Sequence, residues 1–187
     1  MNYFEEFTNT RIKKSDSLAA GISSKVLQIR KESIQKSLKE FEGTEHRQEY
    51  VGTIDEVMYF DDAKAESVNA TWFTFESTVK PIVWIANEPK TPVDYSDLIP
   101  MAKQNVKVLV CIGGKGKKMR KAFADVIKEI YDAASLEEAV EMASILAQED
   151  DIVLFSPACR PDADVSFSEQ GELFKKYVKN IENEHCQ

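Results

Sequence analysis

The chain has 187 residues, of which 43% are hydrophobic, and its formal net charge at pH 7 is −8. This length and apolar content suffice for one domain of ordinary size, or for one domain with an appendage. The acidic balance argues against a nucleic-acid backbone or an anionic membrane as the main partner, because either would repel the chain.

Cysteine usage and the absence of targeting patterns indicate a cellular compartment. The sequence holds 3 cysteines, an odd number without metal-ligand spacing, which suits a reducing compartment better than a disulfide framework. No signal-peptide pattern is present, and no apolar run approaches the roughly 18 residues of a membrane span. We therefore expect a cytoplasmic protein with no membrane association.

The first part of the sequence predicts a helical appendage over residues 1–42, followed by an α/β domain over residues 43–187. Ser15 or Asp16 can cap a first helix, and a second helix stops at Gly43. Around Ile22, Val26, Ile29 and Ile34, the two helices carry more apolar positions than one small packing face requires. We expect them to form a homodimer or to contact another protein chain.

The pattern after residue 48 predicts a β-hairpin that turns at residues 54–56, followed by alternating helices and buried strands. This alternation is typical of a three-layer Rossmann-like α/β sandwich with a mostly parallel sheet. The predicted helices are 64–77, 95–103, 115–127, 135–148 and 169–182, and the predicted strands are 81–86, 106–113, 129–131 and 151–158. Ligands in such folds bind beyond the carboxyl ends of the strands, here at residues 61–64, 87–91, 113–117 and 156–160.

The segment GGKGKK at residues 113–118 lies at one of these ends, just before a predicted helix. Backbone N–H groups at a helix start favour an anion. The segment lacks the Gly-Lys-Ser/Thr ending of a Walker loop, so Mg²⁺ would have no hydroxyl ligand. A solvated surface turn accounts for it better than a phosphate site.

Three segments occur in an informative order: GTEHR at 43–47, DDAK at 61–64 and SPAC at 156–159. In this order and spacing the sequence resembles the C-terminal domain of the Mur ligases, specifically those that add D-glutamate during peptidoglycan synthesis. The resemblance extends from residue 17 to the end of the chain, and residues 17–41 resemble only the last helices of the family's central domain.

The resemblance implies a set of nucleotide contacts. Arg47 matches an arginine that reaches ATP phosphates, and a planar, permanently charged guanidinium suits that task. Asp62 matches an aspartate that contacts ribose hydroxyls, and Lys64 matches a lysine near the reacting phosphate. A salt bridge between Arg47 and Asp62 would be a purely structural alternative.

The D-glutamate pocket implied by the resemblance is altered. Lys90 is displaced from the position of the family's pocket lysine, and Ser156 and Phe167 are the other remnants. Ser156 belongs to a strand-to-loop turn with a structural role. Glu66 replaces a neutral residue and should repel an anionic amino acid, so we expect weak D-glutamate binding.

Catalysis by this chain alone is not expected. The sequence contains no P-loop and no cluster of metal ligands, so no metal site and no tightly bound cofactor are expected, and ATP with Mg²⁺ would require the family's central domain. Cys159 as a nucleophile is less favoured than a structural thiol, and the adjacent Asp61 and Asp62 should point to opposite faces. Three hypotheses remain: a ligase C-terminal domain, a degenerate non-catalytic relative that binds a protein or small ligand, and a weak nucleotide-binding module.

Overall fold

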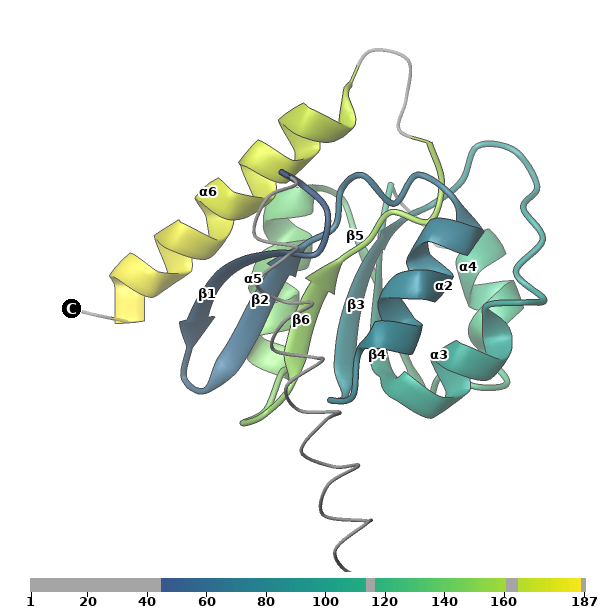
Figure 1. Cartoon of the computed structure of the whole chain (residues 1–187), viewed down its shortest axis with the longest axis horizontal. Coiled ribbons are helices and arrows are strands. Elements are labelled where there is room, and N and C mark those ends of the chain that lie inside the picture. The colour runs from purple at the N-terminus through teal and green to yellow at the C-terminus, as the bar shows by residue number, and fades with distance from the viewer. Residues whose placement is uncertain (1–44, 114–116, 161–164, 186–187) are drawn as a thin grey trace, which may run out of the picture. The chain divides into compact units, whose positions relative to one another are not determined.

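The computed structural model describes residues 45–113, 117–160 and 165–185 (Figure 1). The chain divides into two compact units, Met1–Gly43 and Thr44–Gln187, and the description below concerns the second. The predicted helices of the N-terminal appendage lie outside the described residues. Its domain assignment and its role in assembly therefore stay predictions.

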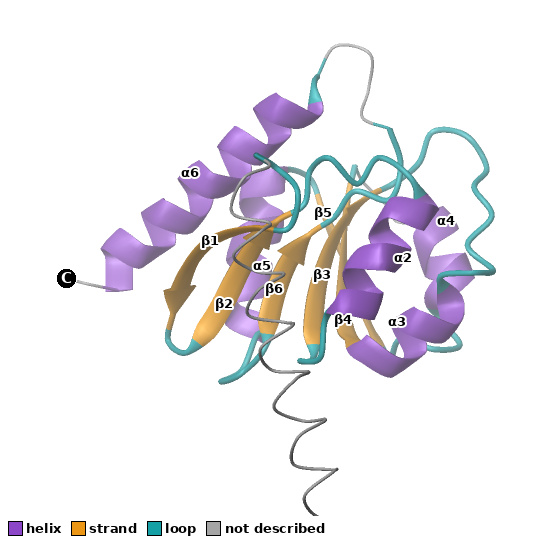
Figure 2. Cartoon of the chain, in the orientation of Figure 1, coloured by secondary structure: helices purple, strands orange, loops and turns teal. Residues whose placement is uncertain are grey.

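A six-stranded sheet forms the centre of the unit, in the order β1-β2-β6-β3-β4-β5 (Figure 2). β1 pairs with β2 in antiparallel fashion and all other neighbours are parallel, which confirms the predicted mostly parallel sheet. The last strand lies between β2 and β3, so it is central, as predicted. The strands are β1 Glu49–Ile54, β2 Val57–Asp61, β3 Ile82–Asn87, β4 Val106–Ile112, β5 Glu129–Ala133 and β6 Ile152–Phe155.

Helices cover both faces of the sheet, which confirms the three-layer architecture (Figure 1). One face carries α2, α3 and α4, and Trp84 of β3 is fully buried there with edge-to-face contacts to Phe75 and Phe123. The other face carries α5 and α6, and Phe155 stacks on Phe174. The helices are α2 Val68–Ser77, α3 Ile99–Asn105, α4 Lys117–Phe123, α5 Leu136–Leu146 and α6 Phe167–His185.

Capping residues explain where several elements begin. Ser135 caps α5, and its hydroxyl accepts a hydrogen bond from the N–H of Glu138 at 3.1 Å, as the sequence predicted. The start predicted for α2 at residue 64 was wrong: the helix begins at Val68 after its cap Ser67. The preceding residues form a turn instead, in which the N–H of Ala65 donates to the carbonyl of Asp62.

The β1–β2 hairpin turns at Asp55 and Glu56, as predicted. Both residues have positive φ, 48° and 64°. Two-residue hairpin turns of the type that matches strand twist require this conformation at both central positions. No helix in the described ranges is long and apolar enough to cross a membrane.

Candidate functional site

The SPAC turn joins three segments at the carboxyl edge of the sheet. The N–H of Ser156 donates to the carbonyl of Ile85 at 3.1 Å, and the N–H of Ala158 donates to the carbonyl of Ala65 at 3.0 Å. The N–H of Asn87 donates to the carbonyl of Pro157 at 3.3 Å. The turn thus positions the loops that follow β2 and β3, which supports the structural role predicted for it.

Asp62 lies beneath this edge, with 2% of its surface exposed. Its carboxylate accepts hydrogen bonds from the hydroxyls of Thr74 at 2.6 Å and Ser156 at 3.0 Å, and from the N–H of Gln48 at 3.2 Å. Burial raises the pKa of Asp62 to about 6, although these hydrogen bonds oppose the shift. The carboxylate of Asp62 is thus held by Thr74, Ser156 and Gln48. Among the described residues it forms no salt bridge with Arg47, so the structural alternative considered for this pair was wrong.

The predicted roles of Asp62 and Ser156 can be compared with this network. The hydroxyl of Ser156 is fully buried and also bonds to the hydroxyl of Thr71 at 2.9 Å. A contact between Asp62 and ribose would require the carboxylate to leave its internal partners. Both predicted ligand contacts stay predictions, and in the described conformation both side chains face inward.

Asp61 points to the opposite side of the sheet from Asp62, as predicted. Its Oδ2 lies 2.7 Å from Nδ1 of His46, and its Oδ1 accepts a hydrogen bond from the N–H of Ala63 at 2.9 Å. Burial raises the pKa of Asp61, whereas the His46 and Ala63 contacts act against this rise. The two adjacent aspartates therefore do not form an acid/base pair.

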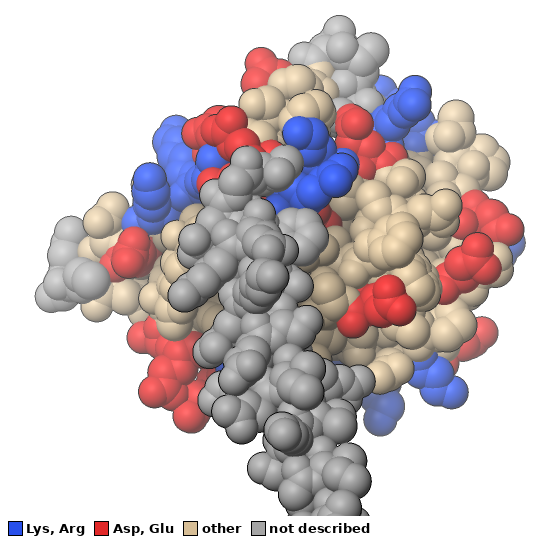
Figure 3. All heavy atoms as spheres, in the orientation of Figure 1, with Lys and Arg blue, Asp and Glu red and all other residues tan. Residues whose placement is uncertain are grey.

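Arg47 and Lys64 lie on two segments that are hydrogen-bonded to each other at the same edge. The N–H of Lys64 donates to the carbonyl of His46 at 3.0 Å, which places Lys64 beside the residue that precedes Arg47. Arg47 is exposed, and Nζ of Lys64 lies 5.4 Å from the ring centroid of Phe167. Two predicted site residues, Lys64 and Phe167, are thus in contact, and Arg47 lies on the adjoining segment. On the face of the molecule drawn in Figure 3, basic and acidic side chains are interspersed.

The loop after β3 contacts the start of α4. The carboxylate of Glu88 accepts hydrogen bonds from the N–H groups of Lys118 at 2.8 Å and Met119 at 3.3 Å. Nζ of Lys118 donates to the carbonyls of Pro89 and Lys90, each at 2.6 Å. An internal carboxylate therefore takes the position considered for a phosphate, while the Lys90 side chain is exposed.

The two histidines are engaged at different ends of the sheet. His46 pairs with Asp61, whereas His185 lies 2.8 Å from Asp55 of the hairpin turn. Cys159 is half-buried, and its Sγ lies 3.6 Å from the carbonyl of Asn87. This arrangement favours a packing role for Cys159 over a nucleophilic one.

The side chains around His46 include candidate metal ligands. Carboxylates of Glu45, Glu49, Asp61 and Glu172 surround this imidazole in two overlapping groups. Lys175 supplies a positive charge there, with Nζ 2.7 Å from Glu172 and 3.3 Å from Glu49. The sequence analysis missed this cluster because it joins residues far apart in the chain. The signal that could have revealed it is Gly171 within a helix, since a Cβ there would lie 2.6 Å from Oδ2 of Asp61.

Comparison with known proteins decides the family. Residues 46–159 match the family model described as "Mur ligase, glutamate ligase domain". The chain belongs to the Mur ligase family. The UDP-N-acetylmuramoylalanine–D-glutamate ligase of Christiangramia forsetii is 37% identical over 167 residues, which cover 89% of this chain and 38% of that protein. The enzyme of the same name from Salinibacter ruber is 36% identical, with coverage of 89% and 36%. This Mur ligase chain thus matches a little over a third of the length of these relatives.

Solved structures agree on the fold. The UDP-N-acetylmuramate-alanine ligase of Thermotoga maritima has a TM-score of 0.52 at 17% identity, and the match covers 78% of this chain and 33% of that enzyme. A MurF ligase from the same organism, solved in complex with ADP, has a TM-score of 0.51 at 14% identity, with coverage of 74% and 32%. Both likenesses concern the fold alone.

Proposed function

We propose that this chain provides the C-terminal lobe of an ATP-dependent, amide-forming ligase site and does not catalyse ligation alone. The observation that carries the proposal is the 3.0 Å hydrogen bond from the N–H of Lys64 to the carbonyl of His46, which holds Lys64 next to the segment that carries Arg47 at the carboxyl edge of a Mur ligase domain. Two cations on adjoining segments suit the oxygens of a nucleotide phosphate. The 187 residues include no P-loop, so the principal nucleotide site would lie in another domain or chain.

Each charge in this lobe has a distinct role. Arg47 is exposed, and it would contact phosphate oxygens directly. Lys64 is half-buried against the face of Phe167, which limits the volume that its ammonium group can sample. Asp62 would support this surface from below by fixing Gln48, the residue after Arg47. ATP and Mg²⁺ would therefore bind mainly through groups outside this domain.

The residues available to bind an amino-acid substrate are less suitable than those available to bind a nucleotide. The relatives' names specify D-glutamate, and the substrate remnants predicted here are Lys90, Ser156 and Phe167. Ser156 is buried and Phe167 lies against Lys64. Half-buried Glu66 adds a negative charge close to the same edge, where it would repel a dicarboxylate. We infer that the chain binds D-glutamate weakly. We also propose that it acts in the cytoplasm and that it assembles with itself or with another protein through residues 1–42.

The nucleotide contact can be tested by calorimetric titration of the full chain with ATP. A dissociation constant of about 1 mM or weaker is expected, because only part of a phosphate site is present. Arg47→Ala and Lys64→Ala should each weaken binding about fivefold or more. Lys80→Ala is the matched control, since Lys80 pairs with Asp150 at the other end of the sheet. Equal affinities for Arg47→Ala, Lys64→Ala and the unmodified chain would contradict the assignment, and micromolar affinity would indicate an autonomous nucleotide module.

A further inference from the structure

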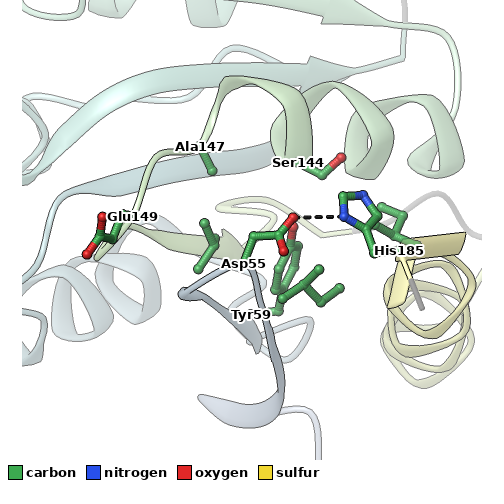
Figure 4. Close-up of a pocket in the computed structure, with 9 residues that line it drawn as sticks. Asp55, Tyr59, Ser144, Ala147, Glu149 and His185 are labelled. Carbon is green, nitrogen blue, oxygen red and sulfur yellow. Dashed lines mark ion pairs between the residues drawn. The ribbon is translucent and has the colours of Figure 1, made fainter. Parts of the chain in front are cut away.

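A cavity of about 230 Å³ lies at the amino ends of the parallel strands, away from the edge that carries Arg47 and Lys64 (Figure 4). Its walls come from the hairpin turn, from the end of α5 with the connection to β6, and from the last turns of α6. Ile54, Val57 and Ile181 give it apolar walls. Nothing in the proposed ligase function uses this cavity.

Tyr59 gives the cavity a polar group. Its side chain lines the cavity, and only 1% of the residue is exposed. Within the described ranges its hydroxyl has no hydrogen-bond partner, and Figure 4 shows the hydroxyl directed toward Asp55. Burial, with a smaller effect from the Asp55 charge, raises the pKa of Tyr59 to about 12, so the phenol stays neutral. A phenol can donate or accept a hydrogen bond, so this hydroxyl can pair with a polar group of a ligand in the cavity.

The charge around the cavity mouth is a second, independent feature that favours a ligand. Asp55 and Glu149 line the cavity, and Glu149 hydrogen-bonds to the neighbouring Glu56. This hydrogen bond and the Glu56 charge raise the pKa of Glu149. Among the described residues that line this mouth, His185 is the basic one, and its Nδ1 lies 2.8 Å from Oδ2 of Asp55. The mouth is therefore short of positive charge.

We propose that this cavity binds a small aliphatic ammonium ion. The hydrocarbon part would pack against Ile54, Val57 and Ile181, and the ammonium group would lie between the hydroxyl of Tyr59 and the carboxylates of Asp55 and Glu149. The cavity volume is below the range of about 300–1,000 Å³ that drug-sized ligands need, so the hydrocarbon part of the ligand can have only a few carbon atoms. A free amine and a lysine side chain of a protein both carry this chemistry.

Binding can be tested by following backbone amide NMR signals of the full chain. The probes are pentylamine, 1,5-diaminopentane and Nα-acetyl-lysine amide, and the matched neutral control is 1-pentanol. The amines should shift signals of residues 54–59, 144–149 and 181–185, with pentylamine about tenfold tighter than pentanol because only the amine carries charge. Tighter binding of the diamine would identify a free amine, and tighter binding of the lysine amide would identify a protein side chain.

Two variants separate the contributions. Tyr59→Phe keeps the ring and removes the hydroxyl, and it should weaken pentylamine binding about fivefold while leaving pentanol binding unchanged. Asp55→Asn should weaken pentylamine binding at least as much, whereas exposed Asp125→Asn should have no effect. If the Tyr59→Phe variant does not fold, the effect of Asp55→Asn on pentylamine binding tests the proposal. Equal binding of pentanol and pentylamine, unchanged binding by Asp55→Asn, or no shift up to about 50 mM amine would overturn the proposal.

Discussion

His46 and Asp61 form a buried pair, with Nδ1 of the imidazole 2.7 Å from Oδ2 of the carboxylate, and His46 immediately precedes the exposed Arg47. Their side chains are 2% and 0% exposed. Gly171 of α6 packs against both of them. The pair thus links the loop that carries Arg47 to the end of β2 and to α6.

Gly171→Ala should destabilise the domain. A Cβ at residue 171 would lie 2.6 Å from Oδ2 of Asp61 and would also collide with the imidazole of His46, so the buried pair must move. Overpacking of this kind costs about 1–3 kcal/mol, which should outweigh the gain of up to about 1 kcal/mol from replacing glycine within a helix. Urea unfolding measures the change.

Gly52→Ala is the matched control for that substitution. Gly52 lies in the edge strand β1, and a Cβ there would meet nothing within 4 Å. Its unfolding free energy should stay within about 0.5 kcal/mol of the unmodified chain. Equal losses for the two variants would show that packing against His46 and Asp61 is not the cause.

Asp62 should make stability depend on pH. Its pKa rises from 3.8 in the unfolded chain to about 6 in the folded domain, so the folded state binds the proton more tightly. The contribution of Asp62 is therefore complete below about pH 4 and is lost as pH rises through about 6, by roughly 3 kcal/mol at most. Urea unfolding between pH 3.5 and 7.5 tests this decline.

Asp62→Asn should remove that decline. Relative to the unmodified chain, the variant should gain stability as pH rises, because its amide carries no charge to bury. Exposed Asp125→Asn should follow the pH profile of the unmodified chain. A constant difference between Asp62→Asn and the unmodified chain across this pH range would show that Asp62 does not titrate as described.

The hairpin, the layers and the central last strand were predictable from the sequence because alternation and helical periodicity are local. The start of α2 was not, since the turn after Asp62 depends on the hydrogen bond from Ala65. The family resemblance singled out Lys64 and Phe167, which are in contact in the structure. It did not show that Asp62 faces inward, because Thr74 and Ser156, which hold its carboxylate, belong to other segments of the chain.

Assembly through residues 1–42 can be tested by light scattering. The full chain should form a homodimer, because the predicted helices there hold more apolar positions than one packing face needs. A variant with Ile22→Glu and Val26→Glu should be monomeric, and Lys31→Glu is the control that leaves the apolar positions intact. If the unmodified chain is a monomer, a dimer through this segment is excluded.

Ligation by the full chain alone tests the central claim most directly. The chain is supplied with ATP, Mg²⁺, UDP-N-acetylmuramoylalanine and D-glutamate, and phosphate release is followed beside a buffer control, with the Christiangramia forsetii enzyme as the positive control. We expect no release above buffer, because Arg47 and Lys64 can only assist a nucleotide held by other groups. Release above buffer that requires all four components would contradict the proposal that this domain is one lobe of a site completed elsewhere.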